Sequence, residues 1–598
     1  MATKAEMARS SIQRESWQDA FSARDDLKKF GDSAIGLFAL ALRFGLDDLD
    51  TVGADAVVDG GDDKKNDLIY IDEEKGFAVI VQAFFARQPK VSAPANKASD
   101  LNTAVTWLLN TPIKQLPDSI RAHGMRIREG LKSGAISTLH VWYVHNCPIS
   151  SNVEVELGAV EHSLKAALSS IVPKANISIS TLEVGTGRFQ DWYCETQSPI
   201  IVNEEFTFEC GTGFETEGKK WKAFVTALPA KFLFEAYKRY GVQLFSANIR
   251  DYLGSRSRDS NINNSIKRTA RDNPKNFWVY NNGVTALTHW FQLDKGSGAR
   301  PQTLTVSGLS IVNGAQTTGA IGALDSAPSD SALVPIRFVS TSDNDLIQEI
   351  VKYNNSQNQI TASDFRSTDS VQKRLKKEIS EIPGADYDGG RRGGSGDAIR
   401  RRPDLLPSYT VGQALAAFHG SPLLAYNKKT DIWTNDATYI KYFHEQTTGA
   451  HLVFVFSLLR AVEATKTSLY QKSKTGVSLK ETEKNQLNFF RSQGAIFVLV
   501  AAIAKSLETI LDQAVPDRFS LSFGTKITPK KAIDRWDPII FATLPFTSSL
   551  YDADDTRMRS QDTDARIGKF ANLVEATANP NRTDFSRFAK QVRHAKFS

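Results

Sequence analysis

The sequence has few cysteines, no long apolar run and only a small excess of one charge. Its three cysteines, Cys147, Cys194 and Cys210, are scattered over 598 residues. They are too few for a disulfide framework or a zinc site, so we expect buried, reduced thiols. The longest apolar run, residues 495–504, is about half of the roughly 20 residues that span a bilayer. The N-terminus lacks the apolar segment of a signal peptide. These absences predict a cytoplasmic protein with no membrane partner.

The common catalytic signatures are also missing. We find no GxxxxGK[ST], no HExxH and no GxSxG pattern. The nine histidines have no paired metal-ligand spacing, and we expect His419 and His451 to pack within helices. The net charge of +6 permits a nucleic-acid partner without requiring one. Composition therefore excludes several enzyme classes and identifies no reaction.

The order of predicted elements indicates a multi-domain α/β protein. Residues 1–190 alternate helices with short strands, which predicts a layered α/β domain. The predicted helices are 33–47, 98–109 and 155–171, and the predicted strands are 67–72, 77–85, 139–145 and 176–184. We expect a central α+β core at 191–425, with helices at 229–240 and 264–270.

Beyond this core, residues 426–598 read as a mostly helical C-terminal region. The helices predicted after residue 403 are 411–419, 452–464, 481–511 and 564–576. Their apolar stripes fit a buried core better than a dimer surface, although a homodimer stays open.

A candidate metal site lies at residues 59–84, DGGDDKKNDLIYIDEEKGFAVIVQAF. The turn Glu73–Gly76 joins two strands as a hairpin. Asp67 then opens one strand and Gln82 lies near the end of its neighbour, about 4.8 Å away. Carboxylate and amide oxygens are ligands that Mg²⁺ accepts, so Asp67 and Gln82 are candidate ligands, with Asp62 or Asp63 assisting.

This layout resembles the PD-(D/E)xK restriction-endonuclease-like fold, in the Mrr-like form with Gln as the second ligand. The resemblance implies a Mg²⁺- or Mn²⁺-dependent nuclease, in which a lysine two residues after the Gln orients the attacking water. Here that position is Phe84. Lys97, at the start of the following helix, is the candidate replacement, and Lys90 is a weaker one. The alternative is a domain that keeps the fold without catalysis.

Three amide-rich segments follow apolar elements in the middle of the chain. Asn281 and Asn282 follow the run FWVY, and Asn313, Gln316 and Thr317 follow the strand LSIV. A third segment contains Asn354, Asn355 and Asn358, at the end of an amphipathic helix. Amides at element ends brace turns or form a polar site on a rigid scaffold. Backbone N–H groups at the start of the helix predicted at 318–324 also favour an anion.

The same segments, in this order, resemble the AIPR family of abortive infection phage resistance proteins. The resemblance extends from about residue 245, at FSANIRDYLG, to about residue 420. It implies a bacterial antiphage defence role and defines the central AIPR core. The segment IVNGAQTT is more weakly similar to DGQHR-type and ParB-like proteins, which handle nucleotides or DNA. A nucleotide-dependent switch is therefore a further alternative.

A glycine- and arginine-rich segment, DGGRRGGSGDAIRRR, is a candidate nucleic-acid contact. Arginine binds phosphate in two-point contacts, and glycine lets the backbone approach closely. The candidate phosphate-binding residues are Arg391, Arg392, Arg400, Arg401, Arg402 and, upstream, Arg250. A solvated surface loop explains the same composition.

These observations predict an abortive-infection protein that hydrolyses phosphodiester bonds of DNA or RNA. Asp67 and Gln82 would hold Mg²⁺, and Lys97 would orient or activate water. The rival interpretation is an inactive sensor or scaffold that binds nucleic acid, a nucleotide or a phage component. Phe84 favours the rival, whereas the Asp67–Gln82 pair favours the enzyme.

Overall fold

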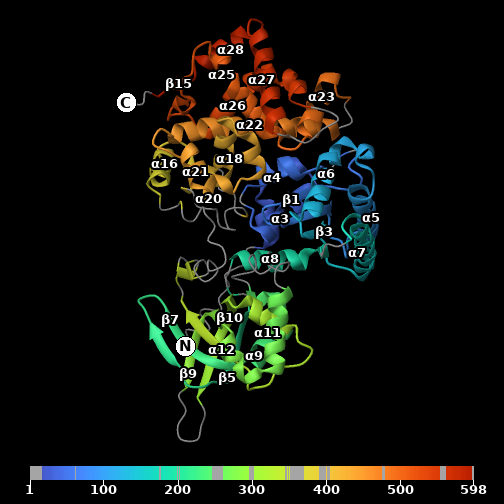
Figure 1. Cartoon of the computed structure of the whole chain (residues 1–598), viewed down its shortest axis with the longest axis vertical. Coiled ribbons are helices and arrows are strands. Elements are labelled where there is room, and N and C mark those ends of the chain that lie inside the picture. Colours follow the sequence, from blue (N-terminus) through green and yellow to red (C-terminus); the bar gives the residue numbers. More distant parts are fainter. Residues whose placement is uncertain are drawn as a thin grey trace. The chain divides into compact units, whose positions relative to one another are not determined.

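The computed structural model divides the chain into two compact units (Figure 1). Unit 1 comprises Met1–Gly187 and Thr361–Ser598, and unit 2 comprises Arg188–Ile360. The structure describes residues 16–598 apart from 47, 59, 61, 174–176, 198–199, 201, 246–259, 295–301, 342, 344–345, 348, 351–365, 367–368, 390–398, 400–403, 475–477, 552–559 and 596–598. Unit 2 is thus inserted between two segments that fold together. The predicted boundary at residue 190 lies beside the start of unit 2, whereas residue 425 falls inside unit 1.

The N-terminal segment of unit 1 contains a four-stranded mixed sheet in the order β1-β2-β3-β4. Its elements are α2 (Trp17–Ser22), α3 (Ser33–Phe44), α4 (Leu49–Ala56), β1 (Leu68–Asp72), β2 (Phe77–Phe84), α5 (Ala95–Leu109), α6 (Asp118–Ser133), β3 (Thr138–His145), α7 (Ser151–Ile171) and β4 (Ser178–Val184). Strands β1 and β2 are antiparallel, whereas β2, β3 and β4 run parallel. The predicted α/β alternation is confirmed, and the hairpin turns at Gly76, whose φ of 76° suits glycine.

Helices cover both faces of this sheet, as parallel strands require. On one face Phe44 of α3 stacks on Trp142 of β3, with ring centroids 5.5 Å apart. On the other face α5 and α7 contribute Leu101, Val105 and Val160 to a core shared with the strands. Residues 77–81 of β2 are accordingly buried without interruption.

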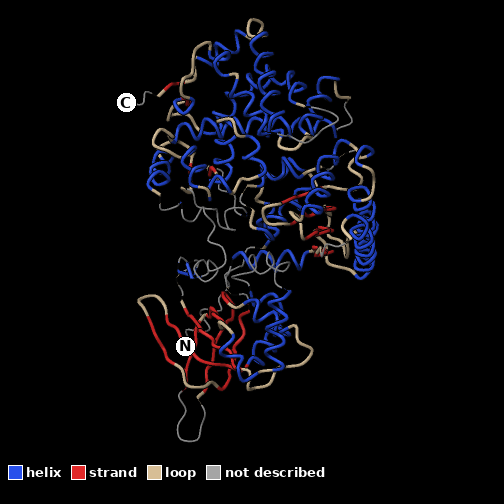
Figure 2. The backbone as a smooth tube through the Cα atoms, in the orientation of Figure 1, coloured by secondary structure: helices blue, strands red, loops and turns tan. Residues whose placement is uncertain are grey.

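The C-terminal segment of unit 1 is mainly helical (Figure 2). Its helices are α16 (Ser370–Ser380), α18 (Ser408–Phe418), α19 (Pro422–Asn427), α20 (Asp431–Thr434), α21 (Asp436–Tyr442), α22 (Gly449–Lys474), α23 (Glu481–Phe490), α24 (Ala495–Lys505), α25 (Leu507–Leu511), α26 (Pro529–Thr543), α27 (Ser560–Ala576) and α28 (Arg582–Ala589). They enclose one apolar core that includes the whole apolar run of α24. The apolar stripes predicted in this region are therefore core.

The single helix predicted for residues 481–511 is wrong in one respect, because the chain forms three helices there. Helix α23 ends at Phe490 with Arg491 as its C-cap, and Gly494, with a φ of 67°, is the N-cap of α24. Within the described residues no single helix has the length and apolar character to cross a membrane. The pair α23 and α24 meets that criterion only when joined, and the pair is bent by 108°.

Unit 2 is built on a seven-stranded sheet, in the order β5-β10-β8-β11-β7-β6 with β9 paired to β10. Its strands are β5 (Val202–Glu209), β6 (Phe214–Glu217), β7 (Lys222–Pro229), β8 (Val284–Thr288), β9 (Trp290–Asp294), β10 (Thr303–Asn313) and β11 (Leu333–Ser340). Its helices are α9 (Ala230–Tyr240), α11 (Ser260–Asp272), α12 (Phe277–Tyr280) and α13 (Ala315–Gly322). The α+β character predicted for the core holds for this unit.

The helix predicted at 318–324 begins three residues earlier, because Gly314 adopts a φ of 88° and starts α13 directly after β10. The apolar run 277–280 forms a helical turn, α12. Cys147 and Cys210 are buried free thiols, as expected, and the side chain of Cys194 lies outside the described residues.

Candidate active site and amide-rich core

The hairpin β1–β2 brings Asp67 and Gln82 together, as predicted from their spacing. Leu68 pairs with Val81, so Asp67, just before β1, lies opposite Gln82. The Gln82 Nε2 donates to Asp67 Oδ2 at 2.6 Å, and the backbone N–H of Ala83 donates to the same oxygen at 2.5 Å. Gln82 is 4% exposed, and its Oε1 is buried without a hydrogen-bond partner.

The oxygen atoms of Asp67 and Gln82 meet part of the ligand requirement of a divalent cation. An unpartnered buried amide oxygen is costly unless something satisfies it, and Gln82 Oε1 beside the Asp67 carboxylate is a suitable pair of oxygen ligands. Mg²⁺ commonly takes one or two protein oxygens and completes its shell with water and phosphate. Among the described residues no group of three or more His, Cys, Asp and Glu side chains is arranged to hold a metal ion.

Asp62 and Asp63 take part in the loop before β1. Both Asp63 carboxylate oxygens accept backbone N–H groups, from Gly60 and Lys65, at 2.8 Å each. The exposed Asp62 carboxylate pairs with Lys64 Nζ at 2.5 Å. Such bonds are those of a self-capped polar turn. Their assignment as metal ligands stays a prediction.

The two candidate lysines lie beside Phe84, the residue that replaces the usual lysine. The Nζ of Lys90 is 5.2 Å from the Phe84 ring centroid, and that of Lys97 is 5.8 Å away. An ammonium within about 6 Å of an aromatic ring gains a cation–π attraction. Phe84 shares the face of β2 that carries Gln82, since side chains two residues apart point the same way. The two ammonium groups therefore lie around the side chain that occupies the lysine position.

Two residues that the sequence analysis did not single out extend the site across the sheet. Gln82 pairs with Tyr143 on β3, and Tyr143 pairs with Glu183 on β4. With Asp67 they form one row of polar side chains on one face of the sheet, because paired residues point the same way. The signal in the sequence was weak, because each is a single polar residue near the end of an apolar strand.

The environment of Tyr143 shows that the carboxylates of this row lie close enough to affect its hydroxyl. Its hydroxyl donates to the Pro94 carbonyl at 3.1 Å. Burial raises the pKa of the Tyr143 hydroxyl, and nearby carboxylates, Glu183 and Asp67 among them, raise it further. Glu183 accepts from the N–H of Ser150 at the start of α7 and pairs with the buried His145 at 3.0 Å. Glu183 is thus held by the helix terminus rather than free in solution.

Two of the three amide-rich segments meet in unit 2. The Asn281 Nδ2 donates to Thr317 Oγ1 at 3.1 Å, and Asn281 Oδ1 accepts the N–H of Gly283 at 2.9 Å. Asn313 pairs with Thr285 at the end of β10, and Gln316 lies half-buried in the first turn of α13, whereas Asn282 is exposed. The amides therefore brace the junction of β8, β10 and α13.

Glycines allow these elements to approach closely. A Cβ on Gly314 would lie 2.7 Å from the Gly283 carbonyl, and one on Gly283 would lie 2.6 Å from the Pro335 carbonyl. Both residues also have positive φ, a conformation that glycine adopts readily.

The remaining predicted site residues lie outside the described residues. They are Asn354, Asn355 and Asn358 of the third amide segment, and Arg250, Arg391, Arg392, Arg400, Arg401 and Arg402 of the phosphate-binding set. Their roles stay predictions.

Comparison with known proteins identifies the central part of the chain. Residues 245–509 match the family model described as AIPR protein. The match covers less than half of the chain and confirms the resemblance found in the amide-rich segments. It also extends into the C-terminal helices, past the predicted end of the AIPR core at residue 425. No curated protein and no solved structure matches the chain significantly.

Proposed function

We propose that this protein acts in antiphage defence and that its N-terminal sheet carries a metal-dependent nuclease site. The AIPR match supports a role in abortive infection. The observation that carries the nuclease proposal is the Asp67–Gln82 pair, with its 2.6 Å hydrogen bond and the buried, unpartnered Gln82 Oε1. The mixed sheet with helices on both faces is compatible with the nuclease-like fold that the sequence resembles.

In this proposal Asp67 and Gln82 hold Mg²⁺ or Mn²⁺, which when bound supplies charge stabilisation for the phosphate and a more acidic water. Lys97, with Lys90 beside it, places positive charge next to Phe84. This charge would orient the water or the phosphate, as the usual lysine does in the resembled pattern. The arginine-rich segment and the AIPR region would hold the nucleic acid.

The second candidate function is an inactive sensor or scaffold that binds nucleic acid, a nucleotide or a phage component. Phe84 favours it, because an aromatic side chain at the lysine position removes the group that the chemistry normally uses. The row Asp67–Gln82–Tyr143–Glu183 would then be a remnant that braces the sheet.

A cleavage panel with the full chain separates the two functions. Plasmid, linear duplex, single-stranded DNA and RNA are incubated with Mg²⁺ or Mn²⁺, and in parallel with EDTA. The nuclease proposal expects cation-dependent cleavage of at least one substrate, whereas the sensor expects retention of a substrate in a gel-shift assay without cleavage. Cleavage that persists in EDTA would contradict the metal-dependent mechanism.

A further inference from the structure

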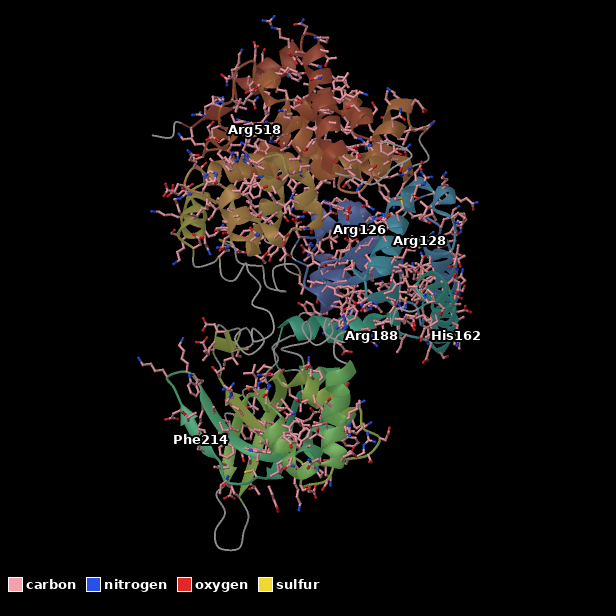
Figure 3. The ribbon with its side chains drawn as sticks, viewed as in Figure 1. Arg126, Arg128, His162, Arg188, Phe214 and Arg518 are labelled. Atoms are coloured by element: carbon pink, nitrogen blue, oxygen red, sulfur yellow. The ribbon has the colours of Figure 1, made fainter. Side chains whose placement is uncertain are left out.

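A cavity of about 30 Å³ lies inside unit 1. Helices of both segments of the unit line it: α4 and α6 from the N-terminal segment, and α19, α22 and α23 from the C-terminal segment. The chain at the bend between α23 and α24 completes the wall, with Arg491, Ser492 and Gln493. Figure 3 labels Arg126, one of the residues of α6 that line the cavity.

Positive charge exceeds negative charge in the lining. The cations are Arg126, Lys466 and Arg491, and the lining carboxylate is Asp55. Arg126 already has partners: it forms an ion pair with Glu73 at 2.9 Å and donates a hydrogen bond to the Tyr426 hydroxyl at 2.7 Å. Asp55 is thus the one lining carboxylate for two further cations.

Lys466 lacks a committed partner. Within the described part of the chain it forms no hydrogen bond and no ion pair. Burial lowers the pKa of Lys466; Asp55 and Glu463 oppose this shift, and Arg491 adds to it. Burial also lowers the pKa of Arg491. Two cations held in one partly buried cavity with a single lining carboxylate would be stabilised by an anion between them.

Two hydrogen-bond donors of the lining are left unsatisfied. Arg491 Nε and Ser492 Oγ are buried without a partner, and Ser492 is only 6% exposed. His123 also lines the cavity, and its Nε2 lies 3.2 Å from the Asp55 carbonyl, to which it donates. Burial lowers the pKa of His123 to about 4, so at neutral pH its Nδ1, also unpartnered, is an acceptor.

Two helix N-termini adjoin the same cavity. Ser119, in the first turn of α6, lines it, and α24 begins two residues after Gln493. Neither terminus has a side-chain cap. The positive ends of the helix dipoles add to the preference for an anion.

We infer that this cavity binds a phosphate group, either as free phosphate or as the phosphoryl end of a small ligand. Phosphate oxygens would accept hydrogen bonds from Arg491 Nε and Ser492 Oγ and balance the charge of Lys466. A protonated phosphate oxygen would donate to His123 Nδ1. The remainder of a larger ligand would lie outside the cavity. This inference does not depend on the nuclease proposal.

Isothermal titration of the full chain with inorganic phosphate tests the site, against chloride at the same ionic strength. We expect saturable binding by the wild type. Ser492→Ala removes one donor without adding bulk, and Lys466→Met removes the charge while keeping the chain length. Each is expected to weaken binding by at least about tenfold, since hydrogen bonds to charged groups are strong. Lys484→Gln, an exposed cation on α23, is the matched control and should bind as the wild type does.

A second titration with adenosine monophosphate distinguishes the two sources of phosphate. Tighter binding than inorganic phosphate indicates the phosphoryl end of a larger ligand, and equal or weaker binding indicates free phosphate. The inference is overturned if phosphate gives no saturable heat beyond chloride, or if Ser492→Ala and Lys466→Met bind phosphate as tightly as Lys484→Gln. Circular dichroism of each variant establishes that the comparison is between folded proteins.

Discussion

Phe84 is the residue that most affects the interpretation of the N-terminal sheet. It stands two residues after Gln82, where the resembled nuclease pattern has lysine, and two ammonium groups lie within 6 Å of its ring. A lysine brought from the loop and helix after β2 would restore positive charge at this point in space. Catalysis with Phe84 in place therefore requires that Lys97 or Lys90 perform the missing role.

A charge-relocation experiment tests this explanation. Lys97→Ala should lower the cleavage rate by about 10- to 100-fold, a range typical of a group that orients a reactant. Adding Phe84→Lys to that variant should recover part of the rate, because it returns the ammonium to the usual position. Lys165→Ala, an exposed lysine on α7, is the control. Full activity in Lys97→Ala, measured as initial cleavage rate, would exclude Lys97 from the mechanism.

Buried histidines predict how stability depends on pH. His451 donates from Nδ1 to the Leu521 carbonyl at 2.8 Å, and its Nε2 lies 3.0 Å from His419 Nε2. Burial lowers the pKa of His451 to about 4 and that of His419 well below 6.5. Both therefore stay neutral in the folded state while the unfolded chain takes up protons. The stability they contribute is complete above pH 6.5 and is lost as the pH falls towards 4.

For His451 the loss is about 3 kcal/mol at most, from 1.36 kcal/mol per pKa unit. Urea unfolding at pH 7 and pH 5 should give a smaller pH effect for His451→Gln than for the wild type. His162→Gln, at an exposed histidine (Figure 3), should leave the pH effect unchanged. An equal pH effect in His451→Gln would show that the neutral pair is not its source. The charged or titratable neighbours His444, Arg518, Lys441 and Asp517 stay in place in both variants.

Elements with strong apolar periodicity could be predicted from the sequence. Elements with few apolar residues on their buried face could not. Strands β1, β2, β3 and β4 and helices α3, α5 and α7 lie within a few residues of their predicted ranges. Helix α6 was missed because its buried face is sparse and includes two glycines, Gly124 and Gly130. The bend at Gly494 was missed because the apolar pattern continues on both sides of it.

The candidate site, likewise, was predicted from the sequence only in part. A hairpin fixes the register of its two strands, so the Asp67–Gln82 contact followed from spacing. The parallel pairings of β2 with β3 and of β3 with β4 depend on crossover helices, and so Tyr143 and Glu183 could be placed only by the structure.

Close approach at the amide-rich junction makes Gly314 a specific test of unit 2. Gly314→Ala adds a Cβ at 2.7 Å from a backbone oxygen, at a φ of 88°. We expect destabilisation of about 1–3 kcal/mol. Gly158→Ala is the matched control, because its Cβ meets nothing within 4 Å on α7, and it should stabilise by about 0.5–1 kcal/mol. Thermal unfolding measures both, and equal effects would contradict the packing at this junction.

At the scale of the whole molecule, a buried ion-pair network joins the two segments of unit 1. Arg460 of α22 bonds Asp48 at 2.7 Å and Glu463 at 2.6 Å, and Thr51 of α4 donates to Glu463 at 2.6 Å. Burial lowers the pKa of Arg460, but the two carboxylates outweigh it, so the net shift is upward. Contacts between residues more than 400 positions apart are not encoded in local periodicity, which explains why the sequence predicted consecutive domains.

Removing one partner of this network should destabilise unit 1 strongly. Arg460→Met leaves Asp48 and Glu463 buried without their cation, at an expected cost of about 3–5 kcal/mol. Arg587→Met removes an exposed pair with Asp584 and should cost about 1 kcal/mol or less. Urea unfolding of the two variants provides the comparison. A loss in Arg460→Met no larger than in Arg587→Met would mean that the network does not hold the segments together.

The AIPR match extends from unit 2 into the C-terminal helices of unit 1, so the matched region does not coincide with either unit. The N-terminal sheet lies outside the match, yet it belongs to unit 1 together with the matched C-terminal helices. The most direct test of the account therefore addresses that sheet.

The deciding measurement is the cleavage rate of Asp67→Asn on the substrate that the wild type cuts with Mg²⁺ or Mn²⁺. Asparagine keeps an oxygen that can accept from Gln82 and Ala83 but loses the charge that would hold the cation. We predict a loss of at least about 100-fold, with Asp25→Asn, an exposed carboxylate, as active as the wild type. A rate for Asp67→Asn equal to that of Asp25→Asn would contradict the nuclease site proposed here.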